Sequence, residues 1–134
     1  MIIVGWLWLR SVLSRRRREK PLRKEMQARA VVTFRASVDV KDRGLLDLTV
    51  CGDLFEVSHP FPPARFLNGL DYCYRAEDTT VELVRGLWHD WIEIGGQPGT
   101  GLSPILIGRR KMNRQIWDAL VRAGAHPIGP PPQP

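Results

Sequence analysis

The chain has 134 residues, 43% of them hydrophobic and 25% charged, which is ordinary for one folded domain. A domain of this size can bury a core without metals or disulfides. The net charge of +6 is unevenly distributed, because residues 1–24 hold eight basic groups and one acid whereas residues 25–134 hold twelve basic groups and thirteen acids. The basic character therefore belongs to a leader, which disfavours a nucleic-acid surface on the domain itself.

The leader, assigned to residues 1–25, combines an apolar run with a basic cluster. Ile2–Leu9 is apolar, whereas a secretory signal has its charges first and a membrane-spanning helix needs about 20 apolar residues. We expect the segment to lie in the interface of a membrane, because aromatic and basic side chains favour that depth. The residues predicted to contact anionic lipid, on the cytoplasmic face, are Trp6, Trp8, Arg15, Arg16, Arg17 and Arg18.

Three alternatives for the leader stay open. In the first, the start codon is assigned too late and the leader is the inner end of a longer spanning helix. In the second, it is a disordered tail that touches RNA or lipid non-specifically. In the third, it is a helix packed on a partner protein. The first alternative gives the same orientation as interfacial binding, because basic residues stay in the cytoplasm.

Residues 26–125 alternate in the way of short strands. In Ala28–Val40 the apolar side chains recur every second residue, and the turn Lys41–Gly44 leads into a second strand, so the two form a hairpin. Further strand signals are LFEVS, LDYCYR, TTVELV, WIEIG and PILIG. The two cysteines, Cys51 and Cys73, have no partner at metal-site or redox spacing and are expected to be reduced, partly buried strand residues. The alternative is a single disulfide between them, if the domain is extracytoplasmic.

One helix closes the pattern. Ile116, Trp117, Leu120 and Val121 recur at helical spacing, and Gly124 stands where a helix ends. Residues 126–134 are rich in proline and are expected to form an extended, solvated, disordered tail. The predicted class is α+β, a mostly antiparallel β sandwich or partly open barrel with one C-terminal helix.

A near-match to a phosphate-binding loop occurs at Gly96–Ser103. Gly96, Gly101 and Ser103 fit the pattern G-x-x-x-x-G-K-[ST], but Leu102 replaces the lysine that contacts the phosphates. The residues that follow are strand-like, whereas a phosphate-binding loop precedes a helix. We therefore interpret this segment as a turn between two strands.

Catalytic and metal-binding patterns are weak. The histidines His59, His89 and His126 are scattered, and only His89 has a neighbour, Asp90, that could orient it as a general base. A small hydrolase built on that pair stays an alternative, although no nucleophile stands in a recognisable setting. We expect no enzyme activity, no cofactor and no metal site.

Two segments form a candidate partner surface. Trp88 and Trp91 are expected in the core or half-buried, with exposure at an interface as the alternative, since tryptophan is enriched at binding hot spots. A second basic cluster precedes the helix and includes Arg114. The candidate partner-surface residues are Trp88, Trp91, Arg109, Arg110 and Lys111.

A strand-rich body closed by a tryptophan-containing helix, NRQIWDALVRAG, resembles the pleckstrin-homology (PH)-like domains of small membrane-associated bacterial proteins. The resemblance covers about residues 28–124 and implies that Trp117 plugs the end of a sheet sandwich. Phosphoinositide-binding members end their first hairpin in [KR]-x-R. Lys41-Asp42-Arg43 matches only that end, and Asp39 and Asp42 oppose the charge.

Together these features predict a non-catalytic binding or scaffold module tethered to a membrane. The alternative is a nucleic-acid-binding protein whose basic leader contacts phosphate. The expected partners are anionic lipid and a protein, with nucleic acid less favoured.

Overall fold

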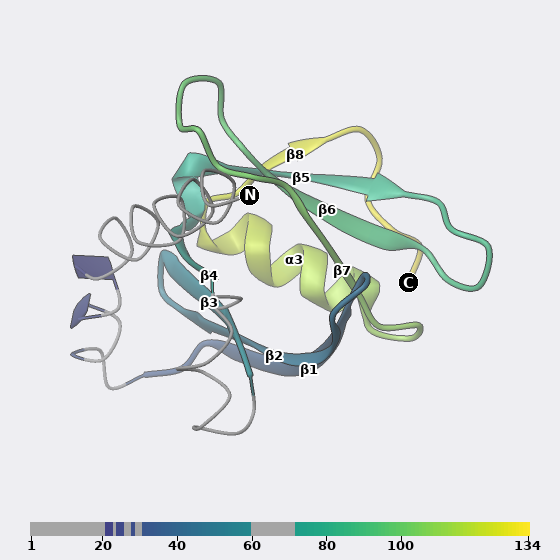
Figure 1. Ribbon diagram of the computed structural model, residues 1–134, viewed down its shortest axis with the longest axis horizontal. Coiled ribbons are helices and arrows are strands. Elements are labelled where there is room, and N and C mark those ends of the chain that lie inside the picture. Colours follow the sequence, from purple (N-terminus) through teal and green to yellow (C-terminus); the bar gives the residue numbers. More distant parts are fainter. Residues whose placement is uncertain (1–20, 23, 26–27, 29–30, 60–71) are drawn as a thin grey trace, which may run out of the picture.

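A computed structural model describes residues 21–22, 24–25, 28, 31–59 and 72–134, and in it one curved sheet partly surrounds a helix (Figure 1). The elements, in chain order, are β1 (Phe34–Val40), β2 (Gly44–Cys51), β3 (Leu54–Ser58), β4 (Tyr72–Arg75), the short 3-10 helix η1 (Ala76–Asp78), β5 (Thr79–Val84), β6 (Trp91–Gly96), β7 (Ile105–Gly108), α3 (Asn113–Ala123) and β8 (His126–Ile128).

The eight strands form one open sheet in the order β4-β3-β2-β1-β7-β6-β5-β8. Neighbouring strands are antiparallel except β5 and β8, which run parallel with Val81 opposite Pro127. The predicted α+β class with mostly antiparallel strands is thus confirmed. No helix within the described ranges is long and apolar enough to span a membrane.

The first hairpin forms where the sequence predicts it. Val38 pairs with Leu46 and Val40 with Gly44, so the buried side chains of both strands share the inner face. The turn between them needs left-handed backbone, with φ of 66° at Asp42 and 90° at Gly44. Aspartate and glycine adopt that conformation more readily than other residues, which explains a sharp reversal at this point.

The core lies between the inner face of the sheet and α3. In Figure 1 the helix occupies the hollow of the sheet, with β1 and β2 on one side and β5 and β6 on the other. Ile116, Trp117 and Leu120 are at most 4% exposed and pack against inner side chains such as Val38 and Phe55. The helical apolar period of the sequence therefore places α3 correctly.

The near-match to a phosphate-binding loop is a strand connection, as predicted. β6 ends at Gly96, β7 begins at Ile105, and the two strands pair antiparallel. Thr100 closes the turn by donating from its Oγ1 to the carbonyl of Gln97 at 2.7 Å.

The prediction of a disordered tail is wrong for residues 126–128, whereas all of residues 126–134 except Pro132 are exposed, as predicted for a solvated tail. His126–Ile128 form the edge strand β8, and Pro132 is buried. Arg114 of α3 donates from Nη1 to the carbonyl of Pro132 at 3.2 Å. Proline lacks an N–H group but keeps its carbonyl, so a proline-rich segment can pack against a donor without regular pairing.

Candidate functional site

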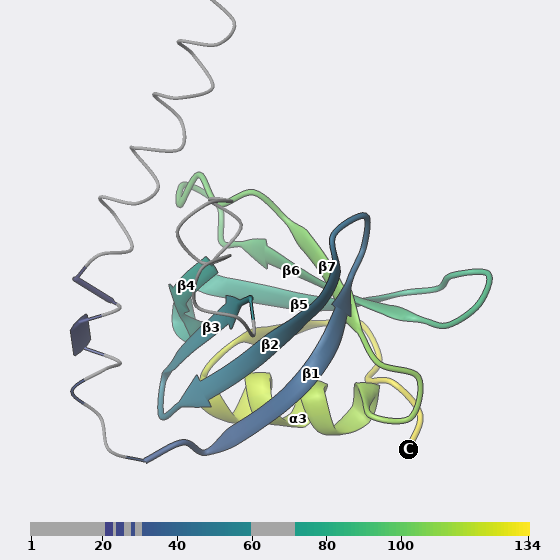
Figure 2. The same cartoon turned by 60° about the horizontal axis from the view of Figure 1, so that its bottom comes forward.

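The loop between β5 and β6, residues 85–90, carries the most exposed large apolar side chains at an end of the domain. Leu87 is 98% exposed and Trp88 is 90% exposed. Single exposed apolar residues are normal on protein surfaces, but two adjacent large ones on a projecting loop indicate a contact surface. The loop projects from the body of the domain in both orientations of the ribbon (Figures 1 and 2).

Asn113 ties this loop to the beginning of α3. Its Nδ2 donates to the backbone carbonyl of Asp90 at 2.7 Å, and its Oδ1 accepts from the backbone N–H of Arg109 at 2.9 Å. One side chain therefore joins the end of the β5–β6 loop to the turn between β7 and α3. Both bonds involve backbone groups, so they fix the path of the chain rather than the position of one side chain.

The base of the loop is close-packed. A Cβ placed on Gly86 would lie 2.4 Å from the carbonyl oxygen of His89 and 2.9 Å from Nε1 of Trp91, so only glycine fits. The rings of His89 and Trp91 are in contact, with centroids 4.2 Å apart. Trp91 is half-buried, unlike its neighbour Trp88. The expected core or half-buried position is therefore correct for Trp91, which supports the loop, and wrong for Trp88, which is exposed.

The turn before α3 places basic side chains beside the loop. Arg110 and Lys111 are exposed and form no ion pair with another described residue. Arg109 is also exposed, and its Nη1 donates to the carbonyl of Ser37 at 3.3 Å. We call Arg85, Leu87, Trp88, Arg110 and Lys111 the distal patch.

A groove of about 680 Å³ separates the loop from the C-terminal tail. Its walls are the β5–β6 loop, the turn before α3 and the tail residues 130–134. Its charged side chains are Arg85, Asp90, Arg110, Lys111 and Arg114, so it is predominantly basic. The wall formed by the tail contacts α3 through Arg114. This side chain donates hydrogen bonds to the carbonyl of Pro132 and, at 3.1 Å, to the carboxylate of Asp118.

The opposite end of the domain receives the last part of the leader. Leu22 packs against a cluster of Cys51, Leu54 and Cys73, which is separate from the main core. Arg75 donates to Glu25 at 2.9 Å and to Asp53 at 2.8 Å, and these bonds raise the pKa of its guanidinium. Residues 22 and 25 were assigned to the leader, yet they contact the folded domain. In Figures 1 and 2 this segment and the β5–β6 loop lie at opposite ends.

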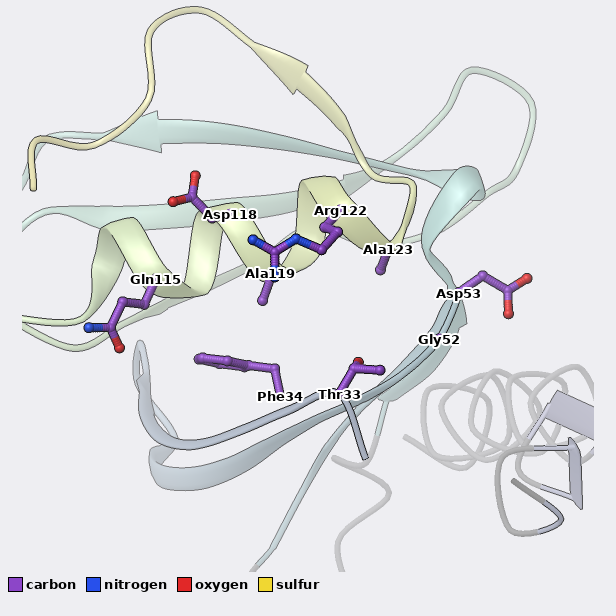
Figure 3. Close-up of a pocket in the computed structure, with 9 residues that line it drawn as sticks. All are labelled: Thr33, Phe34, Gly52, Asp53, Gln115, Asp118, Ala119, Arg122 and Ala123. Atoms are coloured by element: carbon purple, nitrogen blue, oxygen red, sulfur yellow. The ribbon is translucent and has the colours of Figure 1, made fainter. Parts of the chain in front are cut away.

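A second groove, of about 530 Å³, lies between α3 and the beginning of β1. Figure 3 shows Arg122 extending along the helix above Phe34 and Thr33. The two carboxylates at this groove already have cationic partners: Asp118 pairs with Arg114, and Asp53 with Arg75. The groove therefore offers a weaker case for a charged ligand than the basic groove does.

The features considered for catalysis are dispersed. The Nε2 of His89 is buried without a hydrogen-bond partner in the described residues, and Asp90 contacts Asn113 through its backbone carbonyl. His126 bonds the carbonyl of Glu77 at 3.1 Å, far along the chain from His89. Within the described ranges, no group of three or more His, Cys, Asp or Glu residues could hold a metal ion. Cys51 and Cys73 are both buried.

The residues predicted to contact the membrane, Trp6, Trp8, Arg15, Arg16, Arg17 and Arg18, lie outside the described residues. Two contributors to the distal patch, Arg85 and Leu87, were not named from the sequence. The signal that could have found them is the position of Arg-Gly-Leu-Trp between two strands, because the tip of a hairpin loop cannot be covered by its own strands. Comparison with family models, curated proteins and solved structures finds no match for this chain.

Proposed function

We propose that this chain is a non-catalytic, membrane-tethered binding module on the cytoplasmic face of a membrane. Its basic and aromatic leader holds it at anionic lipid, and the distal patch binds a partner. The observation that carries the proposal is the exposure of Leu87 and Trp88 at the end of the domain opposite Leu22 and Glu25.

The contacts at the leader end support a tether whose last residues pack on the domain. Leu22 is partly buried against Cys51, Leu54 and Cys73, and the ion pair of Glu25 with Arg75 adds a second contact. A free linker would let the domain take any orientation. A docked segment instead directs the distal patch away from the leader, which suits a module that holds a partner near the membrane.

We also propose a PH-like fold for the domain. Seven described strands precede α3, in agreement with a strand-rich body closed by a helix. Trp117 is 4% exposed and packs within the core, which fits the plugging role that the resemblance implies.

The tethering part of the proposal is tested by fractionation of the full chain in its host. We expect membranes to retain the protein and high salt to release it, since basic residues near a membrane contribute about 1 kcal/mol each. A variant with Trp6→Ser and Trp8→Ser should move to the soluble fraction while keeping the basic cluster. A fully soluble wild-type chain would exclude tethering, and retention through alkaline carbonate would indicate a spanning segment.

A further inference from the structure

The chemistry of the distal patch and of the basic groove beside it indicates the class of partner. Among the charged side chains that line the groove, four are cationic and one, Asp90, is anionic. Arg114 is engaged by Asp118 and Pro132, whereas Arg110 and Lys111 are exposed and form no ion pair with any described residue. The groove therefore has unmatched positive charge, and carboxylates pair with guanidinium groups through two parallel hydrogen bonds.

The apolar part of the patch lies on the loop that forms one wall of that groove. Leu87 and Trp88 expose nearly their whole side chains, next in sequence to Gly86, which has no room for a side chain. Tryptophan and arginine are the residues most enriched at the centre of protein interfaces. A partner that covers both parts of the patch must carry large apolar groups as well as acidic ones.

Three hydrogen bonds connect the walls of the groove. The side chain of Asn113 forms hydrogen bonds with the carbonyl of Asp90, at 2.7 Å, and with the N–H of Arg109, at 2.9 Å. Arg114 donates a hydrogen bond to the carbonyl of Pro132 in the tail. The end of the loop, the basic turn and the tail are therefore each bonded to the beginning of α3. A preorganised surface loses less conformational entropy on binding, which favours a specific partner.

We propose that the distal patch and the basic groove bind an acidic protein segment that carries large apolar side chains. The inference rests on the proposed function, whose partner it specifies. The acidic side chains pair with Arg85, Arg110 and Lys111, and the apolar ones pack on Leu87 and Trp88.

A protein segment is favoured over lipid by position and over nucleic acid by chemistry. The patch lies at the end of the domain opposite the described part of residues 21–25, and the basic groove beside it is concave, so a flat bilayer would leave it unfilled. Single-stranded nucleic acid is bound by stacking on successive aromatic rings, and beside Trp88 the loop presents the aliphatic Leu87.

The test uses the purified full chain in a non-ionic detergent and a fluorescent peptide of alternating acidic and large apolar residues, followed by anisotropy. One variant replaces the apolar tip (Leu87→Ser with Trp88→Ser), and another removes two charges (Arg110→Gln with Lys111→Gln). All four side chains are exposed, so the fold should persist. The matched controls alter exposed residues elsewhere: Val31→Ser with Val32→Ser, and Arg35→Gln with Arg122→Gln.

We expect each patch variant to weaken peptide binding by at least about tenfold, because hot-spot residues dominate interfaces. The controls should stay within about twofold of wild type, as surface substitutions usually do. Equal peptide binding by wild type and both patch variants would overturn the proposal, since the basic leader would then be the binding element. The proposal is also wrong if the patch variants bind the peptide like wild type but no longer bind phosphatidylserine vesicles or single-stranded DNA.

The result of the peptide-binding test is independent of whether the leader tethers the chain to a membrane. If Trp6→Ser with Trp8→Ser leaves the chain on the membrane, the tethering mechanism fails while the peptide result stands. If the peptide result fails and fractionation succeeds, the chain is tethered and its partner has a different chemistry.

Discussion

Asn113, the first residue of α3, donates a 2.7 Å hydrogen bond to the backbone carbonyl of Asp90, more than twenty positions earlier in the chain. The same side chain accepts from the N–H of Arg109. The β5–β6 loop and the basic turn are therefore joined by one residue, although neither segment belongs to the regular sheet pairing at that point. Both halves of the distal patch depend on this residue for their relative position.

Two substitutions of Asn113 test the contributions of its two hydrogen bonds to stability. Asn113→Asp keeps an acceptor for Arg109, but it places a carboxylate oxygen where Nδ2 donated to the carbonyl of Asp90, and two acceptor oxygens at that distance repel each other. Asn113→Ala removes both bonds and should lower the free energy of unfolding by about 1–3 kcal/mol. We expect hydrogen exchange at residues 85–90 to accelerate in both variants. Urea unfolding should show a loss of stability for the aspartate at least as large as for the alanine, and wild-type stability of the aspartate variant would contradict the bond to Asp90.

Gly86→Ala tests the packing at the base of the loop. The new Cβ would lie 2.4 Å from the carbonyl of His89, a backbone atom that cannot move without shifting the loop. Overpacking of this kind costs about 1–3 kcal/mol. Gly95→Ala is the matched control, because its Cβ would meet only the Thr80 hydroxyl, at 3.1 Å. Thermal unfolding should show a clearly larger decrease for Gly86→Ala, and similar midpoints for the two variants would argue against a close-packed loop base.

Leu22→Asp tests whether the end of the leader covers the outer face of the sheet. Cys51 and Cys73 are 4% and 0% exposed and pack with Leu22. An aspartate at this position cannot stay in an apolar contact, because burying an unpaired charge is costly. We expect native-state labelling of the thiols by a maleimide to accelerate. Leu87→Asp, which alters a residue exposed at the other end, should leave the labelling rate unchanged.

Arg75→Ala should loosen the same contact from its polar side. The ion pairs with Glu25 and Asp53 are partly exposed, so the expected loss of stability is about 1 kcal/mol or less. The raised pKa of Arg75 keeps the guanidinium charged, and its stabilising effect is present below the unfolded-state value and lost only as the pH rises through the folded-state value. Stability differences between wild type and Arg75→Ala should therefore persist throughout the alkaline range below that value. A difference that vanished near neutral pH would contradict the assignment.

Trp117→Ala should be the most damaging of the single changes. Trp117 is 4% exposed within the main core, and truncation of a buried tryptophan costs about 3–5 kcal/mol. Trp117→Phe retains most of the volume and should cost less. Urea unfolding followed by circular dichroism gives both values, and a mild effect of the alanine would mean that the helix does not depend on this side chain.

The sequence alone determined most of the sheet and the helix. Alternating apolar side chains placed β1 and β2, and the helical period of Ile116, Trp117 and Leu120 placed α3, because both periods follow from local backbone geometry. The signal failed where structure depends on distant partners. Pro127 lies in a strand that pairs with the parallel edge of β5, and the buried Pro132 accepts a hydrogen bond from Arg114.

The candidate site was decided by tertiary structure in the same way. The sequence placed Trp88 and Trp91 in one candidate surface, yet one is exposed and the other packs on His89. It identified the basic residues before α3 but could not show that Asn113 brings them beside the β5–β6 loop. Local patterns encode which face of an element is apolar. Which segments meet at the surface is set by sheet order and by single side-chain hydrogen bonds between residues far apart in the chain, and neither leaves a periodic signal.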